Sequence, residues 1–126
     1  MKIQIVSASG EGRTEISAFD NALYKAGIAN YNLIYLSSII PPGSEIIPHQ
    51  KIDWNEKEFG DRLYCVIARS ITTTFGERAW AGLGWKQASD GRGLLVEHHA
   101  ESEETVRKLI DNSLSDMVEY RQTAFG

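Results

Sequence analysis

The chain has 126 residues, of which 42% are hydrophobic and 24% are charged, a composition typical of one compact globular domain. Its formal net charge of −4 argues against nucleic acid as the main partner. The single cysteine, Cys65, excludes an internal disulfide and is expected to be a small buried hydrophobic residue. No window approaches the ~18 apolar residues of a membrane span, and the N-terminus is too short and polar for a signal peptide, so we expect a cytoplasmic protein.

The first part of the chain predicts a helix between two strands. An apolar–polar alternation over residues 2–5 marks the first strand. The next periodic segment is typical of a helix, with Thr14 as a possible N-cap and Gly27 as a natural terminator. The run "YNLIYLS", residues 31–37, predicts a buried strand, which must end before the prolines of "IIPPGS" because prolines do not fit a central strand.

The second part predicts a hairpin followed by a helix. Residues 49–60 are mostly polar and indicate a surface loop. Three strands are then predicted, at residues 61–70, 78–87 and 94–99, and the last two flank the hairpin turn signal "ASDGRG". Ser102 is the expected N-cap of the final helix, which carries a clear apolar stripe.

This order of elements favours an α+β fold with a mainly antiparallel or mixed sheet and segregated helices. An optional further strand fits before residue 61. Helices and strands do not strictly alternate, which disfavours a doubly wound fold. The sequence stops just after the final helix, which in a layered fold suggests that a C-terminal strand is missing.

Ser37 and Ser38 form a hydroxyl pair between an apolar run and a double proline. A serine nucleophile is only weakly supported, because the "GxSxG" elbow is absent and no histidine has a motif relation to the pair. A strand end whose hydroxyls cap nearby backbone groups is the better interpretation from these residues alone.

The surrounding sequence resembles the pyruvoyl-dependent arginine decarboxylase family. The similarity rests on a "GEG" loop, an "AFDxAL" helix, the run "AGIxNxNLIxxSSIxPP", and a "GLLVEH" strand followed by an "ETVRKLI" helix. These motifs keep the family's order and spacing from about Ser7 to Arg107. The run "NLIxxSSIxPP" is the specific part, although Ala29 stands where the family has glycine.

The resemblance implies that the chain cleaves itself between Ser37 and Ser38. The Ser38 hydroxyl would attack the Ser37 carbonyl to form an ester, and β-elimination would leave a 1–37 β chain and a 38–126 α chain. The new N-terminal residue would then hydrolyse to a covalent pyruvoyl cofactor. Asn32 matches a family position implicated in processing, where its amide would polarise the attacked carbonyl. A satisfied turn amide is the alternative for Asn32.

Glu97, in "GLLVEHH", matches the family's proton donor. The pyruvoyl ketone would capture the substrate amine and accept the electrons released as CO2 leaves, and an acid must then protonate the α-carbon. Glu97 follows three apolar residues, so burial is expected to raise its pKa. An outward-facing strand carboxylate is the alternative from the residues alone.

Asp20 matches the carboxylate that binds the substrate guanidinium in this family. It shares one helix face with Ile16, and neighbouring Phe19 and Leu23 are expected to shield it partly. The resemblance also places the backbone near Ile16, together with Ser37, among the substrate-binding residues. A freely solvated helix carboxylate is the alternative for Asp20.

The resemblance therefore implies a carbon–carbon lyase that converts L-arginine to agmatine and CO2. The family's fold is expected to be a layered α/β/β/α sandwich, assembled as a homotrimer or a multiple of trimers with active sites between protomers. The same chemistry on another amino acid, or an unprocessed homologue that binds arginine or agmatine or acts as a structural partner, remains open. No metal is expected, because His98 and His99 are adjacent on a strand and face opposite ways.

Overall fold

The computed structural model describes residues 1–125, which divide into two compact units. The first unit contains Met1, residues 36–44 and residues 66–125, and the second contains residues 2–35 and 45–65. Each unit combines strands with α-helix, which confirms the predicted α+β class. Instead of the one mainly antiparallel or mixed sheet predicted from sequence, the strands of residues 1–125 form two parallel pairs and one antiparallel three-stranded sheet.

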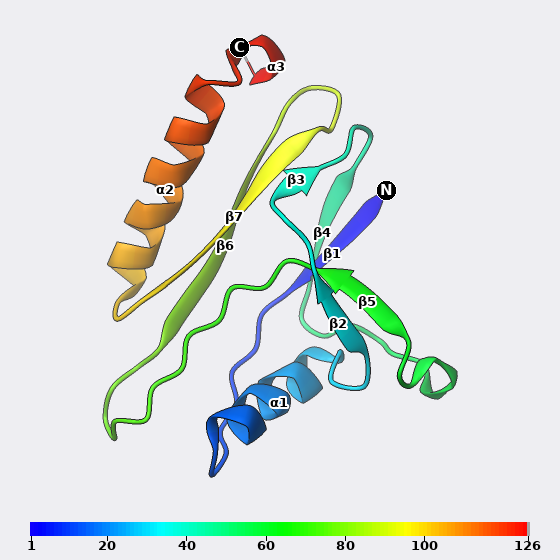
Figure 1. Ribbon diagram of the computed structural model, residues 1–126, viewed down its shortest axis with the longest axis vertical. Helices are drawn as coiled ribbons and strands as arrows, with labels where there is room; N and C mark the ends of the chain where they lie inside the picture. The colour runs from blue at the N-terminus through cyan, green and yellow to red at the C-terminus, as the bar shows by residue number, and fades with distance from the viewer. Residues whose placement is uncertain (126) are drawn as a thin grey trace. The chain divides into compact units, whose positions relative to one another are not determined.

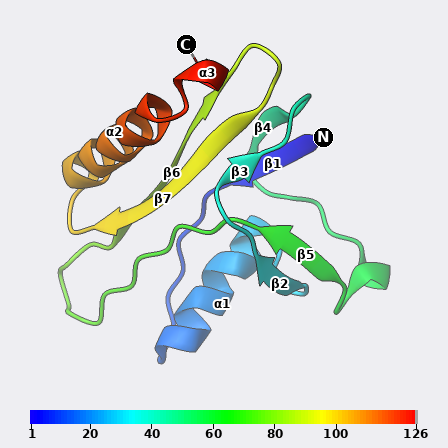
Figure 2. The same cartoon turned by 45° about the horizontal axis from the view of Figure 1, so that its top comes forward.

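Three strands of the first unit form one antiparallel sheet in the order β3-β7-β6. β6 (Trp80–Gln87) pairs along its whole length with β7 (Gly93–Ala100), and β3 (Ile39–Ile40) pairs with the start of β7. α2 (Glu103–Glu119) runs along β6 and β7 and precedes the short α3 (Gln122–Phe125) (Figures 1 and 2). The predicted hairpin and final helix are thus confirmed.

Two glycines in β6 allow α2 to approach the sheet closely. A Cβ atom at Gly82 would lie 2.7 Å from Val106 Cγ1, and one at Gly84 would overlap Ile110 Cγ2. Val106 is buried at this contact, with 5% exposure. The glycine-bearing strand predicted from sequence therefore has a packing reason, since side chains at these positions would push the helix away.

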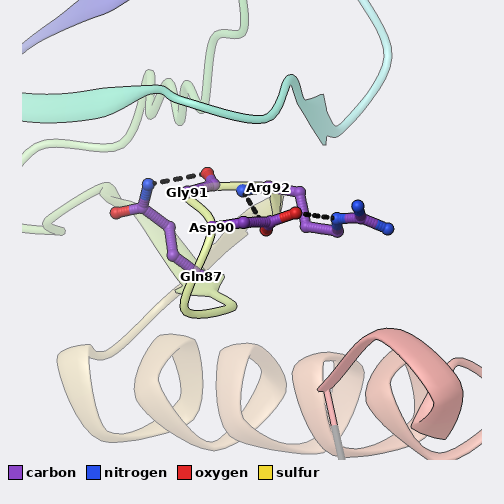
Figure 3. Close-up of polar contacts among 4 residues, drawn as sticks. All are labelled: Gln87, Asp90, Gly91 and Arg92. Carbon is purple, nitrogen blue, oxygen red and sulfur yellow. Dashed lines mark hydrogen bonds and ion pairs between the residues drawn. The ribbon is translucent and has the colours of Figure 1, made fainter.

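Polar contacts hold the turn between β6 and β7 (Figure 3). Gln87 Nε2 donates to the Gly91 and Ser44 carbonyls, each at 2.9 Å. Arg92 donates to Asp90 through its backbone N–H at 3.1 Å and its side-chain Nε at 2.7 Å. These bonds, led by the one from the Arg92 backbone, hold the pKa of Asp90 below its ordinary value. Gly91 has φ of 90°, a left-handed conformation that favours glycine in this turn.

Two parallel strand pairs belong to the second unit. β1 (Lys2–Val6) pairs with β4 (Glu45–His49), and β2 (Asn32–Tyr35) pairs with β5 (Arg62–Cys65). Between β4 and β5 the chain is a loop, as predicted, apart from one turn of 3-10 helix, η1 (Glu56–Glu58).

The helix of the second unit, α1 (Glu15–Ala26), begins and ends where the sequence predicts. Thr14 Oγ1 accepts from the Ser17 N–H at 3.1 Å, and Ser17 Oγ accepts from the Thr14 N–H at 3.1 Å, which completes a capping box. Gly27 follows with φ of 91°, and a Cβ atom there would overlap the Ile52 carbonyl. A glycine is therefore required both by the backbone and by the close approach of Ile52.

Several strand predictions differ from the structure. β5 ends at Cys65, so the strand predicted over residues 61–70 is too long, and residues 66–79 contain neither helix nor strand. Both β3 and β4 lie where the sequence indicates at most one optional strand. β2 is not buried as expected, because Asn32 and Tyr35 at its ends are exposed. The bounds of these strands follow from hydrogen-bonding partners in distant segments rather than from local apolar content.

Candidate active site

The serine pair lies in the first unit, directly before β3. Ser37 is exposed and Ser38 is half-buried. The Ser38 carbonyl accepts a hydrogen bond from the Leu95 N–H of β7 at 2.9 Å. Ser38 is therefore fixed to the central strand of the β3-β7-β6 sheet. The Ser37–Ser38 peptide bond, which precedes this anchor, lies outside the sheet.

The apolar frame around the serine pair is only partly buried. Ile40 has 1% exposure, but Leu36 and Ile39 have 52% and 59%. Successive side chains of a strand point to opposite faces, so Ile39 and Ile40 cannot both enter the core of this unit. Leu36 and Ile39, on either side of the serine pair, are consequently open to solvent in the single chain.

Glu97 lies on β7, two residues beyond the strand position that binds Ser38. This offset corresponds to about 7 Å along the strand. Side chains alternate between the two faces, so Glu97 shares a face with Leu95 and His98 lies on the other. His98 Nε2 is 2.7 Å from Ser113 Oγ of α2, which shows that Glu97 is on the face opposite α2.

The expected burial of Glu97 is wrong for the single chain. Leu94, Leu95 and Val96 are 1%, 6% and 6% exposed, whereas Glu97 is exposed. β3 pairs only with Gly93 and Leu94, and α2 covers the other face of β7. β3 and α2 therefore leave the Glu97 side chain exposed, and this exposure matches the alternative left open by the sequence.

A pocket of about 220 Å³ lies beside Glu97. It is lined by Ile67, Ala68 and Arg69 from the segment 66–79 and by Glu97, His98 and His99 from β7. The lining of the pocket thus includes both an arginine and the predicted acid. Arg69 is not among the residues predicted from sequence; its only signal there is a lone cation after the apolar run "RLYCVIA".

Asn32 begins β2 in the second unit. Its side-chain Nδ2 donates to the Gly60 carbonyl at 2.7 Å, and its backbone N–H donates to the Asp61 carbonyl at 2.8 Å. These bonds join the start of β2 to the turn before β5. The Asn32 side-chain amide is therefore hydrogen-bonded next to a turn, as the alternative interpretation from the sequence expects. Its part in processing stays a prediction.

Asp20 and Ile16 lie about one turn apart on α1, and both are exposed. Ile16 has 82% exposure, and the buried residue of this helix is Ala26, near its C-terminal end. The partial shielding expected for Asp20 is therefore not found. On one face of α1, the apolar Ile16 and the charged Asp20 are therefore both exposed to solvent.

Two further side chains have shifted pKa values outside these regions. Burial raises the pKa of the Cys65 thiol, in keeping with the predicted unreactive role. Desolvation, followed by the Tyr31 hydroxyl's 3.1 Å hydrogen bond to Glu58, raises the pKa of Tyr31.

Among residues 1–125, no cluster of three or more His, Cys, Asp or Glu side chains is arranged to hold a metal ion. Within the same described part of the chain, no helix is both long enough and apolar enough to cross a membrane.

Comparison with known sequences gives one consistent result. The family model for pyruvoyl-dependent arginine decarboxylase matches residues 2–126. A relative from Picrophilus torridus is 38% identical over 105 residues, which cover 81% of this chain and 57% of that protein. A relative from Methanothermobacter thermautotrophicus is 37% identical over 98 residues, which cover 78% of this chain and 61% of that protein.

A third relative, from Methanocaldococcus jannaschii, is 35% identical over 114 residues, which cover 85% of this chain and 66% of that protein. All three relatives are named pyruvoyl-dependent arginine decarboxylase. The chain spans less than two thirds of the length of each.

Proposed function

Because the chain belongs to the pyruvoyl-dependent arginine decarboxylase family, we propose that it converts L-arginine to agmatine and CO2 with a pyruvoyl group made from Ser38. One observation carries the proposal: the 2.9 Å hydrogen bond between the Ser38 carbonyl and the Leu95 N–H. This bond holds Ser38 on the strand that carries Glu97. The cofactor precursor and the acid are then about 7 Å apart along the strand, within the reach of one bound amino acid.

The residues present fit the formation of a pyruvoyl group. Ser38 is anchored by its carbonyl, while Ser37 is exposed and outside the sheet. The Ser38 hydroxyl can attack the adjacent Ser37 carbonyl without a bimolecular entropy cost. The Asn32 side-chain amide has two Nδ2 protons, and the Gly60 carbonyl accepts one of them. The other would assist processing by polarising the attacked carbonyl. The products would be chains 1–37 and 38–126.

The side chains would divide the reaction between them. When formed, the pyruvoyl group supplies the ketone that captures the substrate amine and accepts electrons as CO2 leaves. Glu97 holds the proton that is delivered to the α-carbon. Asp20 accepts two parallel hydrogen bonds from the substrate guanidinium, and the Ile16 backbone and Ser37 complete the contacts with the substrate.

We further propose a homotrimer, or a multiple of trimers, with active sites between protomers. The support is the exposure of Glu97, Asp20 and Ile16 in the single chain. A general acid and a guanidinium-binding carboxylate both work better when they are shielded from water. A neighbouring protomer would supply the cover that the single chain lacks.

The decisive experiment examines the purified protein on a denaturing gel and by intact mass, together with its release of CO2 from L-arginine. We expect two fragments, the larger beginning with a pyruvoyl group and resistant to Edman degradation. Ser38→Ala should remain one inactive chain because it lacks the attacking hydroxyl. Ser89→Ala, in the exposed β6–β7 turn, should process normally. Cleavage of Ser38→Ala at the same bond would overturn the mechanism, and wild-type protein that releases no CO2 would overturn the activity.

A further inference from the structure

A charged residue outside the predicted set shares the pocket beside Glu97. Arg69 lines one side of this pocket with Ile67 and Ala68, and residues 97–99 of β7 line the other. Its volume of about 220 Å³ is several times the ~30 Å³ that one water occupies in the liquid. The pocket therefore has room for a carboxylate together with the carbon that bears it.

The proposed role of Glu97 brings a charged group of the substrate into this pocket. Proton delivery requires the substrate α-carbon to lie within roughly 3 Å of the Glu97 carboxyl group. The α-carboxylate is bonded to that carbon, so it must enter the same region as Glu97. Moving an ionised carboxylate out of water costs free energy unless a partner compensates for its lost hydration. A cation in the pocket would supply that partner.

We infer that Arg69 binds the α-carboxylate of the amino-acid substrate in the pocket that it shares with Glu97. This inference rests on the proposed decarboxylase function. A guanidinium matches a carboxylate in a planar, bidentate geometry, and Arg69 is the one permanently charged cation among the six lining residues. The His98 side chain lies on the α2 side of the strand, where its Nε2 is 2.7 Å from Ser113 Oγ.

This contact distinguishes substrate from product. L-Arginine carries the α-carboxylate, and agmatine has lost it as CO2. Arg69 therefore strengthens binding of the substrate alone and leaves the product free to dissociate. A residue that only supports the fold of the pocket would affect both ligands alike.

The test compares the binding of L-arginine and of agmatine by titration calorimetry in the full chain carrying Ser38→Ala, which excludes turnover. We expect Arg69→Gln to weaken L-arginine binding at least ~10-fold and to change agmatine binding less than ~2-fold. Arg69→Lys keeps the positive charge but lacks the planar guanidinium that donates two parallel hydrogen bonds. It should therefore bind L-arginine more tightly than Arg69→Gln and less tightly than the unchanged arginine. The matched control is Arg78→Gln, because Arg78 is an exposed arginine of the same segment that does not line the pocket. This variant should leave the affinities for L-arginine and for agmatine unchanged.

In the processed protein, Arg69→Gln should raise KM for L-arginine without a matching change in the inhibition constant of agmatine. An equal loss for both ligands, no loss for either, or no binding of L-arginine by the Ser38→Ala chain would overturn the assignment of Arg69. These outcomes are separate from failure of the proposed function, which is a wild-type protein that releases no CO2.

Discussion

The residues predicted to act in the reaction are divided between the two units, which hold them in different ways. In the first unit, Ser38 and Glu97 are tied to one strand, β7, which has hydrogen-bonded neighbours on both sides at its start and α2 along one face. In the second unit, Asp20 and Ile16 lie on an exposed helix face, and Asn32 begins a strand with a single paired neighbour.

This difference matches what each part of the proposed reaction requires. Bond cleavage and proton transfer depend on fixed distances, and a shared β-strand restricts those distances through its backbone hydrogen bonds. Recognition of the far end of the substrate requires an accessible carboxylate with correct geometry. We therefore expect changes in the first unit to affect kcat or stability, and changes on α1 to affect discrimination between substrates.

The largest effect is expected from Glu97→Gln. The variant should cleave itself normally but lose ~10²–10⁴-fold in kcat, because the amide cannot donate the proton to the α-carbon. Steady-state CO2 release, normalised to the processed fraction, measures the loss. Glu101→Gln, an exposed glutamate just after β7, is the control and should retain normal activity. A nearly normal kcat in fully processed Glu97→Gln would remove Glu97 from the mechanism.

A smaller and more selective effect is expected from Asp20→Asn. Loss of the charged, bidentate partner should lower kcat/KM for L-arginine ~30-fold or more, while processing stays intact. L-Citrulline lacks the guanidinium charge, so its slow reaction should barely respond. An equal proportional loss on both substrates would mean that Asp20 supports the site without recognising the guanidinium.

The sheet of the first unit can be tested by filling the gap beneath α2. Gly84→Ala introduces a methyl group that overlaps Ile110, so it should lower the free energy of unfolding by about 1–3 kcal/mol. Urea denaturation measures the change. Combining it with Ile110→Ala should cost less than the sum of the two single changes, because the added methyl then occupies the vacated space. Strict additivity of the two changes would argue against this contact.

The smallest effect concerns pH and the β6–β7 turn. The folded pKa of Asp90 lies below its ordinary value of 3.8, so the ionised carboxylate stabilises the folded state above that value. This contribution is lost as the pH falls through the lower, folded pKa. Asp90→Asn should therefore reduce Tm by less than about 4 °C at pH 7, and the difference should shrink toward pH 3. A difference that grows on acidification would contradict this account.

Local signals account for the features that the sequence predicts well. Thr14 and Gly27 mark the ends of α1 because a capping box and a left-handed glycine act within a few residues. The turn before β7, with Gly91 in a left-handed conformation, and the Ser102 N-cap of α2 are also predicted correctly because they depend on nearby residues alone. Ser38 and Glu97 are found through motif resemblance, and their roles stay predictions; the structure shows that Ser38 is hydrogen-bonded to the strand that carries Glu97.

The sequence by itself determined α1, α2, the β6–β7 hairpin, the family and the residues that its motifs assign to the chemistry. Only the tertiary structure decided that β1 pairs with β4, that Glu97 is exposed, and that Arg69 joins Glu97 in one pocket. Strand pairing and burial depend on segments tens of residues apart, so no local pattern specifies them. Glu97 illustrates this: three apolar neighbours predict burial, yet the short β3 and the one-sided cover from α2 leave its side chain open.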